Sequence, residues 1–305
     1  MEKKDNSPLK ISSISELHRI LNLPKPLHPL ISLVDNTSMS VNKEMLNRSF
    51  VFDFYKISYK FSENGKIGYG QGYYDFNEGG MMFTAPNQIL FTEEDAEYHG
   101  YTLLIHPDFL RNYPLAKNIK KYGFFSYDTN EALHLSDKEK NTIVGLMNNI
   151  LDEMNNAIDE VSQDVIVSYI EVLLNYSNRF YKRQFITRKA INNDFLSKME
   201  DLLEEYFNQQ DTLTKGLPTV EFLASKLNLS THYLSDMLRN LTGQNAQQHI
   251  HEKLIEKAKE YLTTTNFSVA EIAYNLGFEH AQSFNKLFKK KMNTTPLSYK
   301  QSFMN

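Results

Sequence analysis

The chain of 305 residues contains no cysteine. This absence excludes disulfide bonds, metal sites built on thiolates and a cysteine nucleophile. Long apolar runs are also missing: none approaches the roughly 18 residues of a membrane-spanning helix, and the first twenty residues hold no signal-peptide core. We therefore expect a soluble, cytoplasmic protein with no membrane partner.

Metal-ligand spacing is absent as well. His28, His99, His106 and His134 form no His-x-His pair beside a glutamate, which a metal-dependent enzyme would need. We expect no metal, no cofactor and no catalytic residue.

The charge of the chain is divided unevenly along its length. The total is −4, but residues 212–305 carry 11 basic and 7 acidic groups, whereas residues 1–211 carry 22 and 30. A module of charge +4 thus follows a part of charge −8. The length predicts about two domains, and the charge split indicates that they meet different partners.

Residues 28–106 are rich in short runs of valine, isoleucine, tyrosine and phenylalanine, separated by turn signals such as Asn64-Gly65. This spacing, with no helical pattern between the runs, favours an antiparallel barrel or sandwich. We assign residues 28–135 to this β domain and set residues 1–27 apart as an N-terminal extension. The tyrosines on the expected strands are either core residues or part of a ligand site: Tyr55, Tyr59, Tyr69, Tyr73 and Tyr74.

Helical periodicity begins after the β domain. The capping box Ser136-Asp-Lys-Glu139 starts one amphipathic helix, and a second follows after a short turn. Residues 136–178 should form an antiparallel hairpin, either as core or as a dimer interface. The basic run from Arg179 to Lys189 is interpreted as a solvated connector, with phosphate or interdomain contact as the alternative. This hairpin and connector, residues 136–190, precede a C-terminal domain at 191–305.

Two segments of the C-terminal domain, about 219–241 and 268–291, repeat one pattern. Val220, Ala224 and Leu227 of the first recur 49 positions later as valine, alanine and leucine. Each copy is typical of a helix-turn-helix unit, in which the small alanine lets two helices cross closely. A periodic helix between the copies connects them.

These residues resemble the AraC-type family of bacterial transcription regulators. The most specific stretch runs from Ala258 through the second copy to Thr295-Pro296, and the β-rich part is similar to the cupin-type sensory domain of that family. The resemblance implies an α+β protein. It would combine an N-terminal antiparallel, cupin-like β-barrel and helical hairpin with a C-terminal all-α domain of two helix-turn-helix units.

The resemblance also places the DNA contacts. It implies base contacts from His232, Ser235, Asp236, Gln282, Asn285 and Lys286, and phosphate contacts from Arg239, His280, Lys289 and Lys290. The side-chain chemistry is suitable, because glutamine and asparagine pair with adenine, lysine with guanine, and aspartate with cytosine N4. Lys253 and Lys300 stand where the family often has arginine. Asn293 replaces a usual glycine, and asparagine also tolerates the left-handed conformation.

The leading hypothesis is a regulator that binds double-stranded promoter DNA as a homodimer through residues 136–178. A small-molecule effector or partner would act on the N-terminal domain, and RNA polymerase is a further candidate partner. One alternative is a ligand-independent regulator whose β domain only dimerises. Another is a cupin enzyme with a fused DNA-binding tail, which bound metal would support.

Overall fold

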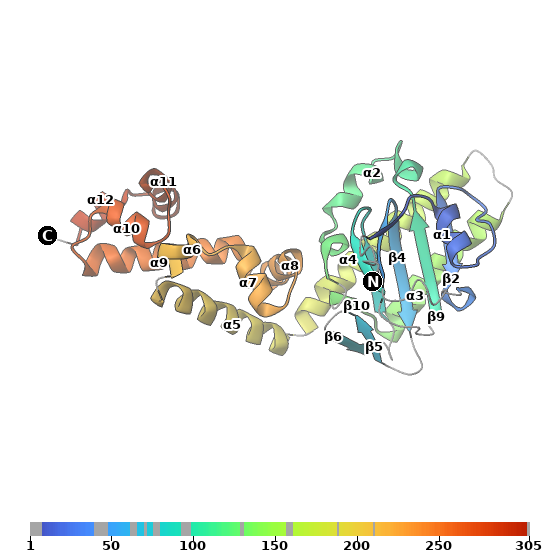
Figure 1. Ribbon diagram of the computed structural model, residues 1–305, viewed down its shortest axis with the longest axis horizontal. Coiled ribbons are helices and arrows are strands. Elements are labelled where there is room, and N and C mark those ends of the chain that lie inside the picture. Colours follow the sequence, from blue (N-terminus) through green and yellow to red (C-terminus); the bar gives the residue numbers. More distant parts are fainter. Residues whose placement is uncertain are drawn as a thin grey trace, which may run out of the picture. The chain divides into compact units, whose positions relative to one another are not determined.

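The computed structural model describes residues 8–39, 48–61, 66–69, 72–75, 80–92, 99–128, 131–156, 161–187, 189–209 and 211–303. The chain divides into two compact units, residues 1–184 and 185–305. Strands occur in the first unit, whereas the described part of the second is helical (Figure 1).

The first unit is built on a five-stranded sheet in which every neighbouring pair is antiparallel. Its order is β10-β7-β4-β9-β2. In the central strand, Tyr59 lies opposite Met81 on one side and Tyr101 on the other. Successive residues Ile57 and Ser58 are both buried, so both faces of this strand are covered. The five strands are β2 (Ile31–Asp35), β4 (Tyr55–Phe61), β7 (Gly80–Thr84), β9 (His99–Ile105) and β10 (Leu133–His134).

Two smaller sheets complete the described strands. One contains β1 (Leu9–Ile11), β3 (Arg48–Phe52) and β8 (Ile89–Thr92), and the other is the hairpin of β5 (Lys66–Tyr69) and β6 (Gly72–Asp75). β1 runs parallel to β3, in an otherwise antiparallel arrangement. The predicted combination of an antiparallel, strand-rich first part with a helical second part is confirmed.

Part of the segment predicted to be a separate N-terminal extension belongs to the core of the first unit. Ile11 of β1 and Ile14 of α1 (Ile14–Ile20) are fully buried against Phe52 and Phe54. Ser13 begins α1 by accepting a hydrogen bond from the Glu16 amide at 3.1 Å. A three-residue strand is too short to show the alternation by which strands are recognised in sequence.

The predicted helical hairpin is present as α3 (Asp137–Asn155) and α4 (Ser162–Thr187), and α3 begins at the predicted capping box. α4 continues through most of the basic run rather than ending before it. Within that run, Arg183 donates two hydrogen bonds to Glu139, at 3.0 and 2.6 Å, and one to the His134 carbonyl. Short helices lie around the sheets: η1 (Asn36–Ser38), η3 (Pro107–Leu110), α2 (Leu115–Asn118), η4 (Ile119–Lys121) and η5 (Gly123–Ser126).

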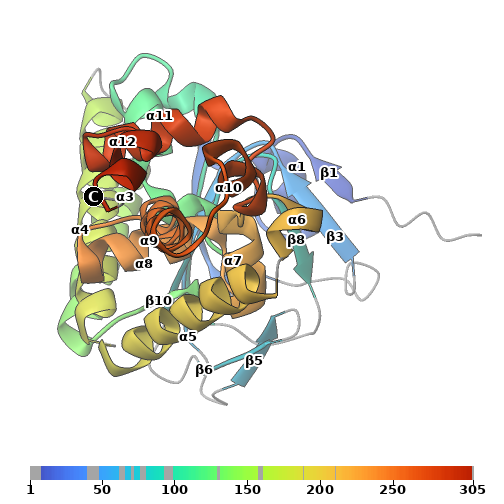
Figure 2. The same ribbon diagram turned by 90° about the vertical axis from the view of Figure 1, so that its left-hand side faces the viewer.

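The second unit is arranged around one helix, α9 (Ala246–Thr264), which Figure 2 shows among its neighbours. α9 contacts α5, α7, α8, α10 and α12, and its buried face is apolar. The remaining helices are α5 (Lys189–Asn208), α6 (Asp211–Lys215), α7 (Val220–Leu227), α8 (Thr231–Thr242), α10 (Val269–Asn275), α11 (Ala281–Met292) and α12 (Pro296–Gln301). Across the described residues, none of the helices combines the length and apolar character needed to cross a bilayer.

Candidate nucleic-acid interface

The two repeated segments fold into the same local structure, α7–turn–α8 and α10–turn–α11. In the first turn the Leu229 amide donates to the Ala224 carbonyl at 2.9 Å, and in the second the Phe278 amide donates to the Ala273 carbonyl at 3.0 Å. Both alanines are buried, as a close crossing of two helices requires. The sequence repeat is therefore a structural repeat of two helix-turn-helix units.

Each turn passes through one left-handed residue, but the two copies use different residue types. Asn228 has φ +54° in the first turn, and Gly277 has φ +92° in the second. A Cβ added to Gly277 would lie 2.7 Å from the carbonyl carbon of Gly216, because these two backbones touch. Asn228 is exposed and has room for its side chain. Packing of the second turn therefore requires glycine there, whereas the first turn requires only a residue that tolerates positive φ.

The second helix of each unit buries one face and exposes the other. Leu234, Met237 and Leu238 of α8 are buried, as are Phe284 and Phe288 of α11. Ser230 begins α8 with a side-chain hydrogen bond from the Tyr233 amide, whereas His280 at the start of α11 makes no side-chain cap bond. This placement presents the opposite face of each helix outward, as a recognition helix requires.

On α8, the predicted site residues lie along the outward face but differ in exposure. His232 and Arg239 are exposed, and Ser235 and Asp236 are half-buried. Arg239 Nη1 lies 2.7 Å from Asp236 Oδ1, so these two charges already form an ion pair within the helix. α8 consequently carries no net charge at pH 7 when His232 is neutral.

On α11 the predicted residues are exposed without exception: Gln282, Asn285, Lys286, Lys289 and Lys290, together with His280 just before the helix. The helix contains four lysines and no acidic residue. Lys291 lies 4.0 Å from Glu252, and Lys286, Lys289 and Lys290 have no ion pair within the described part of the chain. α11 therefore supplies most of the positive charge of α8 and α11 taken together.

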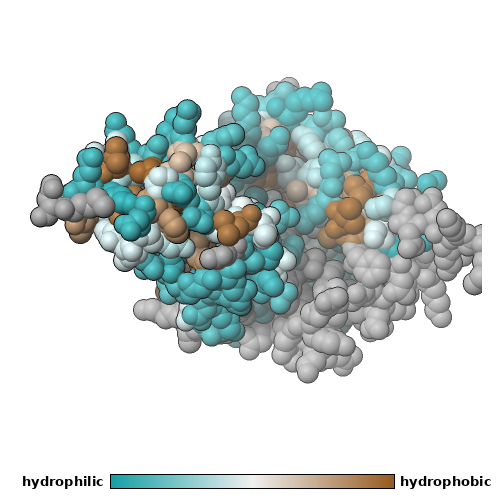
Figure 3. Space-filling model, turned by 60° about the vertical axis from the view of Figure 1, so that its left-hand side comes forward, coloured by the Kyte–Doolittle hydropathy of each residue, from teal (hydrophilic) through white to brown (hydrophobic). Residues whose placement is uncertain are grey.

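The surface drawn in Figure 3 is largely hydrophilic, and its apolar patches are small and separate. The exposed large apolar side chains of the second unit are Ile186, Leu213, Phe267, Tyr274, Leu297 and Phe303, none of them on α8 or α11. The outward faces of these two helices are therefore polar, which suits contact with a charged polymer more than an apolar interface.

Comparisons with known proteins agree with this geometry. A helix-turn-helix domain family matches residues 223–302, about a quarter of the chain. The HTH-type transcriptional activator RhaS of Salmonella schwarzengrund is 30% identical over 121 residues, which are 39% of this chain and 41% of that protein. The C-terminal unit is an AraC-type helix-turn-helix domain. The match spans only about two fifths of the length of the activator.

Two solved structures are similar to about a third of this chain. The C-terminal domain of the response regulator YesN from Fusobacterium nucleatum is 35% identical, with a TM-score of 0.31, covering 34% of this chain and 95% of that chain. The C-terminal domain of AraT, a response regulator from Geobacillus stearothermophilus, is 29% identical, with a TM-score of 0.31. The match covers 35% of this chain and 84% of that chain.

A cluster of charges holds α5 against the central helix of the AraC-type domain. Glu204 of α5 lies 2.6 Å from Lys253 Nζ and 2.8 Å from Lys257 Nζ, both on α9. These two hydrogen bonds lower the pKa of Glu204 to about 2. Nothing in the periodicity of the sequence indicates this cluster, because Glu204 lies about 50 positions before the two lysines.

Lys300 of α12 makes a second link within the domain. Its Nζ donates to the Phe267 carbonyl at 2.7 Å and to the Thr265 carbonyl at 3.1 Å, both in the loop before α10. Lys253 and Lys300, the two positions where the family often has arginine, thus hold helices and loops together here. Asn293 ends α11 with φ +56°, in the left-handed conformation expected of it.

Glutamine at position 204 should make the domain less sensitive to acid. The folded pKa of Glu204 is below its ordinary value of 4.5, so its stabilisation is complete above pH 4.5 and is lost as the pH falls toward 2. Because Glu204 is 41% exposed, solvent screening limits this contribution to about 1 kcal/mol. Urea unfolding measures this difference: between pH 5 and pH 2, the free energy of unfolding should fall by about 1 kcal/mol less in Glu204→Gln than in the wild type.

Glu205→Gln is the matched control, since Glu205 is exposed on the same helix and, among the described residues, its side chain bonds only to Gln209. The free energy of unfolding that this variant loses on acidification should equal the loss of the wild type. Equal behaviour of the two variants would contradict the role of Glu204.

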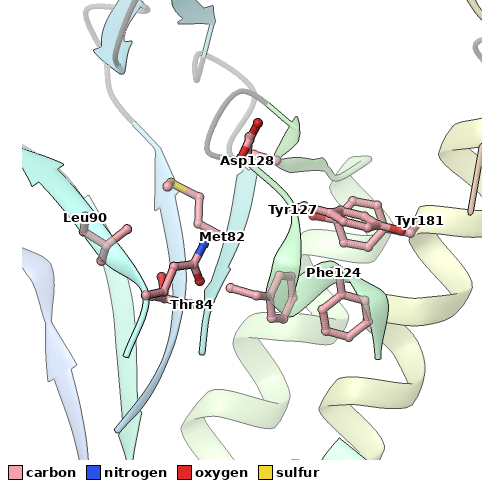
Figure 4. Close-up of a pocket in the computed structure, with 10 residues that line it drawn as sticks. Met82, Thr84, Leu90, Phe124, Tyr127, Asp128 and Tyr181 are labelled. Carbon is pink, nitrogen blue, oxygen red and sulfur yellow. The ribbon is translucent and has the colours of Figure 1, made fainter. Parts of the chain in front are cut away.

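The first unit holds a recess that its own side chains nearly fill (Figure 4). Met82, Thr84 and Leu90 of the strands face Phe124, Tyr127 and Tyr181 across it. The rings of Phe124 and Tyr181 stack with centroids 5.5 Å apart, and the remaining volume of about 10 Å³ fits about one water. This recess has no room for an effector.

The tyrosines predicted as ligand candidates are only partly described. Tyr55 and Tyr59 are buried, whereas the side chains of Tyr69, Tyr73 and Tyr74 lie outside the described residues. Within the described ranges, no three histidine, aspartate or glutamate side chains gather as a metal-ligand set.

Proposed function

We propose that this chain is a sequence-specific, DNA-binding transcription regulator of the AraC type. The observation that carries the proposal is the pair of helix-turn-helix units packed on α9, with a lysine-rich second recognition helix. α8 and α11 would enter successive major grooves on one face of the duplex, about 34 Å apart.

The outward residues of the two helices would divide between base and phosphate contacts. We assign base contacts to His232, Ser235, Asp236, Gln282, Asn285 and Lys286, and phosphate contacts to Arg239, His280, Lys289 and Lys290. For Asp236 and Arg239, binding would exchange their mutual ion pair for cytosine N4 and a phosphate. An exposed pair of this kind contributes about 1 kcal/mol or less, so the exchange costs little.

The first unit would provide assembly and control. The hairpin at residues 136–178 would form the homodimer interface, since α3 leaves Leu151 and Met154 half-buried. Val161, just before α4, and Val172, in the middle of α4, are exposed. A small-molecule effector would shift the population of DNA-competent arrangements, and RNA polymerase would be a further partner. A DNA partner places this action in the cytoplasm, and the proposal includes no enzymatic step, metal or cofactor.

Selection of bound genomic fragments by the purified full chain tests this function. Fragments recovered at about 0.15 M salt should share a recurring sequence with two half-sites per bound chain, and a dimer should protect twice that length. A set of fragments that shares no sequence would contradict specific recognition. A footprint confined to the length of one domain at saturating protein would contradict the dimer.

Lys286→Ala should weaken binding in a sequence-dependent way. If Lys286 contacts guanine, the loss should be about 1–3 kcal/mol on the selected site and close to zero when that base pair is changed. Binding titrations on the two duplexes at one salt concentration measure this difference. Lys290→Ala is the control, because loss of a phosphate contact should weaken both duplexes equally. Equal losses in Lys286→Ala would exclude base reading by this side chain.

A further inference from the structure

The first unit contains a second, larger cavity, separate from the filled recess. It lies between the turn after β7 and the short helices that follow β9, with Tyr55 of β4 among its lining residues. Its volume is about 420 Å³, within the range of small-molecule sites. Its apolar wall consists of Ala85, Pro86, Pro107, Leu110, Ala116 and Ile119.

The walls of this cavity are fixed by the fold rather than by a ligand. The turn before β8 is held by a hydrogen bond from the Asn87 amide to the Phe52 carbonyl at 2.7 Å, and by one from the Ala85 amide to Gln88 Oε1 at 3.1 Å. On the opposite wall, Leu110 and Ile119 are buried in the core. A site formed in this way needs little ordering when a ligand enters.

Three polar side chains line the cavity: Tyr55, Asn87 and Lys120. The Tyr55 ring packs edge-on against Phe125, with centroids 5.2 Å apart, and burial raises the pKa of its hydroxyl, which therefore stays protonated. Within the described residues, neither Tyr55 nor Lys120 has a hydrogen-bond or ion-pair partner of its own. The cavity thus offers one neutral donor and one cation next to an apolar wall.

The charges around the cavity are positive. Lys117 and Lys121 lie within three residues of Lys120. The acidic group next to the wall, Asp108, is already paired with Arg111 at 2.7 Å. A carboxylate, sulfonate or phosphate would therefore meet Lys120 without a competing acid in the wall.

We propose that this cavity binds a small organic anion with an apolar ring or chain, whose acidic group pairs with Lys120 and Tyr55. The apolar part lies against Pro86, Leu110 and Ile119. The role of such a ligand as effector rests on the proposed function. Its binding to the cavity is independent of that function.

Direct titration of the full chain, without DNA, tests the site. The probes are benzoate, 2-naphthoate and octanoate, each compared with its uncharged amide. The chain contains no tryptophan, so 2-naphthoate fluorescence can be followed without interference from indole. At least one acid should bind at submillimolar concentration and about tenfold more tightly than its amide. Absence of submillimolar binding by all three acids, or equal binding of acid and amide, would overturn the proposal.

Three variants locate the bound probe. Lys120→Met should weaken acid binding about tenfold and leave amide binding unchanged. Lys117→Met is the matched control, because Lys117 is exposed on α2 and does not line the cavity; it should change neither. Ala116→Leu, which adds three carbon atoms at the cavity wall, should weaken binding of both. Equal effects of Lys117→Met and Lys120→Met, or full binding in Ala116→Leu, would place the probe elsewhere and overturn the proposal.

The fold of each variant is checked by its unfolding temperature, so loss of binding in an unfolded variant is not counted. DNA selection succeeds or fails independently of these titrations. If the probe binds but DNA selection fails, the anion site is supported and the proposed regulator function is rejected. If DNA selection succeeds but no probe binds, only the anion site is rejected.

Discussion

Replacing Gly277 with alanine is expected to destabilise the AraC-type domain by about 3 kcal/mol. Two costs add. An alanine at φ +92° costs about 1–2 kcal/mol, and its Cβ would lie 2.7–3.0 Å from backbone atoms of Gly216 and Leu217. Backbone cannot rotate away as a side-chain end can, so a displacement costing a further 1–3 kcal/mol or so is expected. Urea unfolding of the full chain, followed by helical circular dichroism, measures the shift.

Gly243 provides the matched control. It ends α8 with φ +80°, but a Cβ added there meets no heavy atom within 4 Å. Gly243→Ala should therefore show only the conformational cost, about 1–2 kcal/mol. If both variants lost the same stability, the contact between Gly277 and Gly216 would have no energetic role.

Neutralising three lysines of α11 is expected to have the largest effect on DNA binding. Lys286, Lys289 and Lys290 are exposed and have no acidic partner among the described residues, so their charges are available to the duplex. The triple variant Lys286→Gln, Lys289→Gln, Lys290→Gln should bind about a hundredfold or more weakly at 0.15 M salt. The slope of log affinity against log salt should fall by about 2–3 for each bound chain.

An equal change in net charge elsewhere is the control for this experiment. Lys25, Lys117 and Lys121 are exposed in the first unit, and replacing all three with glutamine removes the same charge. That variant should keep nearly the full salt slope, since its lysines do not contact the duplex. A similar fall in both slopes would indicate a general charge effect rather than contacts from α11.

Much of the candidate interface could be predicted from the sequence because its signals are local. Ala224 and Ala273 mark the helix crossings by their size, and the apolar positions of α8 and α11 recur at helical spacing. Ser136 and Glu139 marked the start of α3 for the same reason. Each of these features depends on residues within one or two turns of helix.

Other features could not be predicted because they join distant parts of the chain. The contact of Gly277 with Gly216 and the pairing of Glu204 with Lys253 depend on how helices pack. β1 gives the same lesson in the first unit, since its pairing with β3 crosses about 40 positions of sequence. Propensity and periodicity carry no information about such partners.

The sequence by itself determined the two helix-turn-helix copies, the order of strands before helices and the split of charge. These follow from period, residue size and composition, which are properties of short segments. Only the tertiary structure decided which charges remain available. Asp236 and Arg239 pair within α8, Lys253 and Lys300 hold helices and loops, and α11 keeps its lysines exposed. Whether a charge is paired depends on distances of a few ångströms between side chains, and folding sets those distances.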